Sequence, residues 1–92
     1  MYKVVVSKNF SKSLKKISKS GNFSRNEIQA VVDLLASGKK LNIKYKDHKL
    51  QGEYKDCREC HIRPDLLLIY QIIDNELVLV LIDIGSHSEL FR

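Results

Sequence analysis

Three strand-like runs in the second half of the chain, separated by two-residue turns, constrain the fold more than any other feature. The runs cover residues 54–63, 66–73 and 76–84, and the turns between them are Pro64-Asp65 and Asp74-Asn75. Both dipeptides are typical of tight turns. Strands joined by tight turns pair antiparallel, so this half predicts an antiparallel meander. The middle run is apolar on both alternations, and we therefore expect it to be the central strand.

The first half predicts a short strand followed by two amphipathic helices. Residues 2–6 are rich in β-branched side chains, and apolar residues then recur at helical spacing in residues 10–17 and 28–35. We expect Ser7 to cap the first helix and Ser24 with Glu27 to form a capping box for the second. Gly21 and Gly38 should end the two helices.

The expected fold class is α+β, in the order β-α-α-β-β-β, with a helical hairpin packed on a small twisted antiparallel sheet. A chain of 92 residues predicts a single domain spanning residues 1–92. The longest apolar run is far shorter than the ~20 residues of a membrane helix, and the N-terminus lacks the apolar core of a signal peptide. We therefore expect a cytoplasmic protein with no membrane partner and with reduced cysteines.

Charge is divided unevenly between the two halves. Residues 1–46 hold eleven Lys and Arg and two acids, a net charge of +9, whereas residues 47–92 hold five bases and nine acids, a net charge of −4. A basic half of this density is typical of a polyanion-binding surface. A solvated helix face is the alternative interpretation, and composition alone does not decide between them.

The three histidines are the first candidate functional residues. His48, His61 and His87 lie at element boundaries or in a polar strand, where functional groups concentrate. Other candidates are the turn residue Asp65 and four more side chains, namely Lys46, Arg58, Arg63 and Phe91. Tyr70 lies among aliphatic residues, and we expect it to be a sheet residue with its hydroxyl at the rim.

The segment Cys57 to His61 matches the C-x-x-C-H pattern of haem attachment. The pattern is disfavoured because no export signal is present, because Met1 is the only methionine, and because the segment is predicted to be a strand. Residues three apart on a strand point to opposite faces, so we expect that Cys57 and Cys60 do not bind the same ligand. We expect ordinary thiols, no metal site and no cofactor.

Three segments resemble a known family. Residues 45–52 (YKDHKLQG), 58–70 (RECHIRPDLLLIY) and 85–91 (GSHSELF) are similar, in order and at matched spacing, to the YafQ-type toxins of bacterial type II toxin–antitoxin systems, in the RelE/ParE superfamily. The resemblance covers essentially the whole chain. It implies an endoribonuclease that cuts mRNA in the ribosomal A site and is silenced by a co-expressed antitoxin.

The resemblance also implies roles for the candidate residues. Metal-free cleavage uses the neighbouring 2′-OH as nucleophile and leaves a 2′,3′-cyclic phosphate and a 5′-OH end, so one group must take a proton and another must give one. His87 is expected to be the general acid, with Asp65 or His48 as the base. His61 and Arg63 would stabilise charge on the phosphorane. Phe91 would stack on a base, with Lys46 and Arg58 as further RNA contacts and the lysine-rich helices on ribosomal RNA.

One position departs from the family pattern, and two other functions stay open. Relatives often carry a basic residue shortly before the Gly-Ser/Thr-His motif, where this chain has Asp83 and Ile84, and we expect Arg63 to compensate. The alternatives are a ParE-like poison of DNA gyrase and a non-catalytic RNA-binding module. ParE-like chains generally lack the histidines, so the three histidines favour the nuclease.

Overall fold

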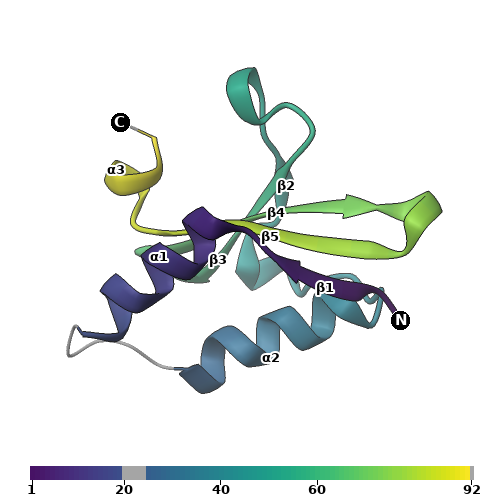
Figure 1. The fold of residues 1–92 in the computed structure, drawn as a ribbon, viewed down its shortest axis with the longest axis horizontal. Helices are drawn as coiled ribbons and strands as arrows, with labels where there is room; N and C mark the ends of the chain where they lie inside the picture. Colours follow the sequence, from purple (N-terminus) through teal and green to yellow (C-terminus); the bar gives the residue numbers. More distant parts are fainter. Residues whose placement is uncertain (20–24, 92) are drawn as a thin grey trace.

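The structure is a computed structural model that describes residues 1–19 and 25–91 (Figure 1). The helices are α1 (Lys8–Ser18), α2 (Arg25–Ala36) and the short α3 (His87–Leu90). The strands are β1 (Lys3–Val6), β2 (His48–Lys49), β3 (Arg58–Arg63), β4 (Leu66–Ile73) and β5 (Val78–Gly85). Three 3₁₀ turns complete the elements: η1 (Ile43–Tyr45), η2 (Gly52–Tyr54) and η3 (Asp74–Glu76). The α+β class is confirmed.

The five strands form one sheet in the order β1-β5-β4-β3-β2. Strands β2 to β5 pair antiparallel with β4 at the centre, which confirms the predicted meander. The expectation of a wholly antiparallel sheet is wrong for β1, which pairs parallel with β5. Only strands joined by tight turns are forced to be antiparallel, whereas the long helical connection after β1 lets it lie parallel to β5.

Two elements and two strand boundaries differ from the expectation. Strand β2 and helix α3 are not predicted, because two residues and four residues give too little periodicity. The predicted strand 54–63 begins only at Arg58, since Gly52 has φ 70° and starts a 3₁₀ turn. The predicted strand 76–84 is Val78–Gly85, because Leu77 has φ 53° and breaks the extended chain.

The helix boundaries follow local chemistry. Ser7 caps α1, with its hydroxyl accepting the N–H of Phe10 at 3.0 Å, as predicted. Gly38, just after α2, adopts φ 79° and donates its N–H to Leu35 at 3.1 Å. The predicted break at Gly21 and capping box at Ser24 lie outside the described residues. No helix in the described part of the chain is long and apolar enough to cross a membrane.

The core lies between the helical pair and one face of the sheet. In Figure 1, α1 and α2 lie on one side of the sheet, while α3 and the β2–β3 connection lie on the other. Buried apolar side chains from α1 and α2, such as Phe10 and Val31, pack on Cys60 and Leu79 of the sheet. A second, smaller cluster of Leu67, Ile69 and Leu90 lies beneath α3. We call this second side of the sheet the open face.

Candidate active site

Strand register brings two of the histidines to the open face. His48 of β2 lies opposite Glu59 of β3, which lies opposite Ile69 of β4. His61 lies opposite Leu67, which in turn lies opposite Gly85 of β5. Side chains of directly opposed residues point to the same face, and Ile69 and Leu67 belong to the open-face cluster. Two strand spacings, roughly 10 Å, separate His61 from Gly85, two residues before His87.

Glu59 is a buried carboxylate between two imidazoles. It is 4% exposed and is the buried charged residue of the described chain. Its Oε1 lies 3.5 Å from Nε2 of His48 and 3.4 Å from Nε2 of His61. Each contact becomes an ion pair when the ring is protonated. Sequence reasoning missed Glu59, although its position two residues before His61 on the same strand parity is a signal that it shares that face.

The second nitrogen of His48 also has a partner. Its Nδ1 lies 2.7 Å from the carbonyl oxygen of Lys46, and since a carbonyl only accepts, the ring donates there. With Nε2 facing Glu59, both ring nitrogens face acceptors.

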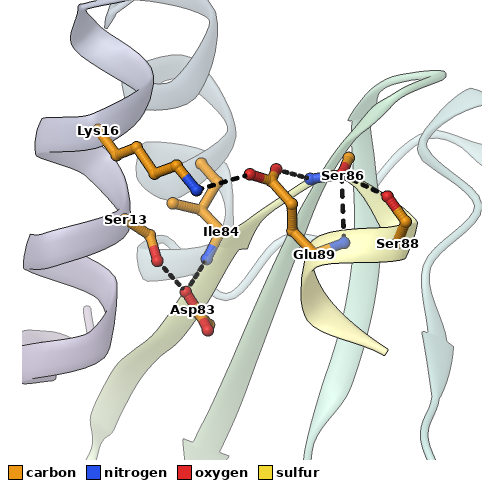
Figure 2. A network of polar contacts seen from close by, with 7 residues as sticks. All are labelled: Ser13, Lys16, Asp83, Ile84, Ser86, Ser88 and Glu89. Atoms are coloured by element: carbon orange, nitrogen blue, oxygen red, sulfur yellow. Dashed lines mark hydrogen bonds and ion pairs between the residues drawn. The ribbon is translucent and has the colours of Figure 1, made fainter. Parts of the chain in front are cut away.

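Helix α3 is fixed by a capping box and by a contact with α1 (Figure 2). The Ser86 hydroxyl accepts the N–H of Glu89 at 3.3 Å, and Glu89 Oε1 accepts the N–H of Ser86 at 2.9 Å. Lys16 of α1 lies 3.4 Å from the other Glu89 oxygen. The Ser86 backbone N–H, with help from the Ser86 hydroxyl and Lys16, lowers the pKa of Glu89. His87 is therefore the first residue of a short helix that is held by its capping box and by the contact of Glu89 with Lys16 of α1.

Phe91 lies between two aromatic rings. Its ring centroid is 5.0 Å from that of His87 and 6.0 Å from that of Tyr54, which meets it edge-on at 86°. Phe91 and Tyr54 both pack against the open-face cluster. Burial raises the pKa of Tyr54, so its hydroxyl stays neutral. Tyr54 was missed because it was predicted to start a strand instead of ending a 3₁₀ turn.

Asp65 shares a hollow with the start of α3. The hollow has a volume of about 270 Å³, and its lining includes Asp65, Arg63 and Ser86. A second hollow of about 490 Å³ is lined in part by Lys46, His61 and Arg63. The structure thus places Asp65 beside the helix that carries His87, and two of the expected RNA-contacting cations beside His61.

Arg63 leaves the face of His61 because β3 has an irregularity. His61 pairs with Leu67 and Arg63 with Leu66, so Ile62 is an extra residue that breaks the alternation. The Arg63 guanidinium turns to α2 and donates from Nε to Glu27 at 2.8 Å. Glu27 raises the pKa of Arg63.

The Asp83 carboxylate accepts its hydrogen bonds from other groups of the protein. Its Oδ1 accepts from the Ser13 hydroxyl of α1 at 2.6 Å and from the Ile84 N–H at 2.8 Å, as Figure 2 shows. The acid that departs from the family pattern therefore connects β5 to α1.

Comparison with known proteins shows the family of this chain. Residues 2–92 match the family model of the bacterial toxin of type II toxin–antitoxin systems, YafQ. The chain belongs to the YafQ toxin family. An mRNA interferase toxin YafQ of Escherichia coli K12 is 34% identical over 77 residues, which are 83% of this chain and 82% of the relative.

Two solved structures show the YafQ fold over the whole chain. YafQ in the Escherichia coli DinJ–YafQ complex has a TM-score of 0.89 and 32% identity and covers 100% of both chains. A metal-bound toxin from Helicobacter pylori has a TM-score of 0.92 and 50% identity, over 99% of this chain and 100% of that one. The resemblance seen in the sequence is therefore confirmed.

In this YafQ-family chain, Arg58 and Tyr70 lie on the helix side of the sheet. The Arg58 guanidinium binds Asp47, with Nη2 and Nε 2.9 and 3.2 Å from Oδ2, and 35% of its side chain is exposed. Its RNA contact stays a prediction. Tyr70 is a sheet residue, as expected, but its hydroxyl is not at the rim: the residue is 1% exposed, and the hydroxyl donates to Asp47.

The two cysteines lie on opposite faces of the sheet. Cys57 is half-buried beside the open-face cluster, whereas Cys60 is fully buried against the helices. Burial raises the pKa of both thiols, that of Cys60 to about 12. Across residues 1–19 and 25–91, no group of three or more His, Cys, Asp or Glu side chains is arranged to hold a metal ion.

Proposed function

We propose that this YafQ-family toxin is an endoribonuclease that cuts mRNA in the ribosomal A site by attack of the 2′-OH on the adjacent phosphate, without a metal ion. The observation that carries the proposal is the gathering of His48, His61 and Phe91 on the open face, with the His87 ring 5.0 Å from that of Phe91. Escherichia coli relatives are named mRNA interferases, which supports the same activity here.

His87 is the proposed general acid, and Asp65 the proposed base. His87 is exposed at the start of α3, so its ring can approach the leaving 5′-oxygen. Both nitrogens of His48 face acceptors, whereas Asp65 is exposed in the β3–β4 turn and lines the hollow next to Ser86. That difference favours Asp65 over His48 for taking the 2′-OH proton.

His61 and the two aromatic side chains complete the proposed site. Glu59 Oε1 lies 3.4 Å from Nε2 of His61 and holds the ring in place, so that the ring would be a preformed donor to the charge that develops on the phosphorane. Phe91, supported by Tyr54, offers a ring on which a base can stack. Lys46, which lines the larger hollow with His61, would contact a phosphate next to the cut, and Arg63, turned to α2, a phosphate farther along the RNA.

The proposed partners are the translating ribosome and a cognate antitoxin. Exposed lysines of α1, including Lys12 and Lys15, would hold ribosomal RNA. The Escherichia coli YafQ solved with DinJ supports an antitoxin that silences the toxin. We place the activity in the cytoplasm, where ribosomes translate, and assign it to one toxin domain of residues 1–92.

The test adds purified protein to ribosomes that translate a defined mRNA. The protein is first treated with a chelator, and elemental analysis confirms that it holds no metal. We expect the chelator-treated protein to cleave the mRNA at the same rate as the untreated protein. RNA binding without new ends would indicate a binding module, and gyrase-linked DNA breaks with intact mRNA would indicate a ParE-like poison. Cleavage that needs a restored metal ion would refute the metal-free route.

A further inference from the structure

Three polar side chains on the helix side of the sheet, Asp47, Arg58 and Tyr70, have no proton-transfer role in the proposed cleavage. Asp47 lies in the loop between η1 and β2, Arg58 begins β3, and Tyr70 lies in β4. Arg58 donates to Asp47 Oδ2 from Nη2 and Nε, and the Tyr70 hydroxyl donates to Oδ1. Arg58 and Tyr70 are register partners across β3 and β4. One carboxylate thus ties the loop to two strands.

The cluster keeps one protonation pattern around neutral pH. Burial, and then the hydrogen bond to Asp47, raise the pKa of Tyr70 above its usual value, so its hydroxyl stays a donor. The Asp47 carboxylate also raises the pKa of Arg58, which stays charged. No side-chain nitrogen or oxygen buried in the described part of the chain lacks a hydrogen-bond partner. The cluster of Asp47, Arg58 and Tyr70 therefore leaves no buried polar atom without a hydrogen-bond partner.

The anchored loop sets the direction of the His48 ring. His48 follows Asp47 directly, and its Nδ1 donates to the carbonyl of Lys46 at 2.7 Å. Lys46 has φ 50°, in the left-handed region, so the backbone turns sharply there. The imidazole belongs to His48, which follows Asp47, and is hydrogen-bonded to Lys46, which precedes Asp47. A shift of Asp47 therefore moves the imidazole relative to Glu59.

We propose that Tyr70 and Arg58 act through Asp47 as positioning residues for His48, holding its imidazole against Glu59 on the opposite face of the sheet. Tyr70 of β4 and Arg58 of β3 both bind the Asp47 carboxylate, and Asp47 lies in the loop before β2. Neither Tyr70 nor Arg58 has to touch RNA for this role. The catalytic consequence of this inference rests on the proposed nuclease function, whereas the position of the ring does not.

The test variants are Tyr70→Phe, which removes one hydroxyl and keeps the ring, and Asp47→Asn, which keeps the side-chain shape. In each, we expect the ring ¹H–¹⁵N signals of His48 to shift. We expect kcat for mRNA cleavage to fall roughly tenfold with KM unchanged within about twofold, because Glu59 contacts both rings and a displaced His48 would misplace the proposed donor His61. Asp47→Asn gives the same test should Tyr70→Phe not fold.

The matched control is Tyr2→Phe. Tyr2 also donates its hydroxyl to an aspartate, Asp74, but at the β4–β5 turn and not beside β2. The Tyr2→Phe variant should leave the His48 ring signals and the kcat for mRNA cleavage unchanged. Wild-type signals and kcat in both test variants would overturn the proposal, as would an equal shift in Tyr2→Phe. If the wild-type protein cuts no mRNA, the proposed function fails, and the His48 signals alone decide whether the cluster positions the ring.

Discussion

At the scale of single residues, the sheet separates groups that are neighbours in the sequence. Glu59 and His61 face the open side, whereas Cys60 between them is buried against the helices. The alternation of a strand therefore makes one segment serve both the core and the site. The same alternation keeps Cys57 and Cys60 apart, although their spacing matches a ligand motif.

Both thiols should be unreactive and dispensable. Their raised pKa values leave little thiolate at pH 8, because the thiolate fraction falls as the pKa rises above the pH. Iodoacetamide should label Cys60 only after denaturation, and Cys57→Ser should cut mRNA at the wild-type rate. Mass spectrometry of labelled protein and a cleavage assay give the two readouts. Rapid labelling of native Cys60, or an inactive Cys57→Ser variant, would contradict this assignment.

At the scale of elements, α3 is too short to be stable by itself. Four residues are far below the length at which an isolated helix forms, so the capping box, the contact with Lys16 and the burial of Leu90 together hold it. The contact also joins α3, which carries His87, to α1, which carries the lysines. Positioning of the proposed acid thus depends on a surface carboxylate.

Glu89→Gln should lower the free energy of unfolding in a pH-dependent manner. The folded-state pKa of Glu89 is lowered, so its contribution is complete above the usual value of 4.5 and is lost as the pH falls through the folded-state pKa. We expect a deficit of about 0.5 kcal/mol at pH 7, small because the side chain is partly exposed, and none near pH 2.

Urea unfolding of the wild type and Glu89→Gln at the two pH values measures this deficit. The matched control is Glu76→Gln, which changes an exposed carboxylate in η3 and should lose nothing at either pH. An equal deficit at both pH values would show that the carboxylate charge does not stabilise the cap.

The sequence predicts elements whose signals are local and misses features that depend on pairing. Ser7 and Gly38 mark helix ends by their own chemistry, so those ends were predictable. The burial of Glu59 depends on which residue of β2 and β4 lies beside it, and the direction of Arg63 depends on the extra residue Ile62. Neither is visible in the residue pattern alone. The residue pattern singled out the three histidines and the family resemblance gave them roles, whereas only the register joined His48 and His61 to Glu59.

At the scale of the whole molecule, the basic half of the chain borders the site. The lysine-rich helix α1 runs beside β5 (Figure 1) and contacts Glu89 of α3 through Lys16 (Figure 2). The C-terminal end of α2 lies beside the N-terminus, where the Tyr2 N–H donates to the carbonyl of Ala36 at 2.8 Å, and away from α3 (Figure 1). Lys39 and Lys40 follow this end of α2 in the sequence. A polyanion held by α1 would therefore approach His87, and one held beyond α2 would not.

Removing lysines from α1 should weaken ribosome binding more than removing lysines elsewhere. For Lys12→Gln with Lys15→Gln, we expect the slope of log affinity against log salt to fall by about one for each phosphate that is no longer bound, or about two in all. Lys39→Gln with Lys40→Gln changes the net charge equally and should leave the slope near that of the wild type. Sedimentation with ribosomes over a range of salt measures both. Equal slopes in the two double variants would show that charge, and not its position, matters.

The central claim is that the open face and α3 together cut mRNA, with His87 as the acid. The most direct measurement is primer extension with 5′-OH-specific end labelling on ribosome-bound mRNA, using the wild type and His87→Ala matched by circular dichroism. We expect new 5′-OH ends at the A-site codon with the wild type and none with His87→Ala. Equal cleavage by His87→Ala, or no new ends with the wild type, would contradict it.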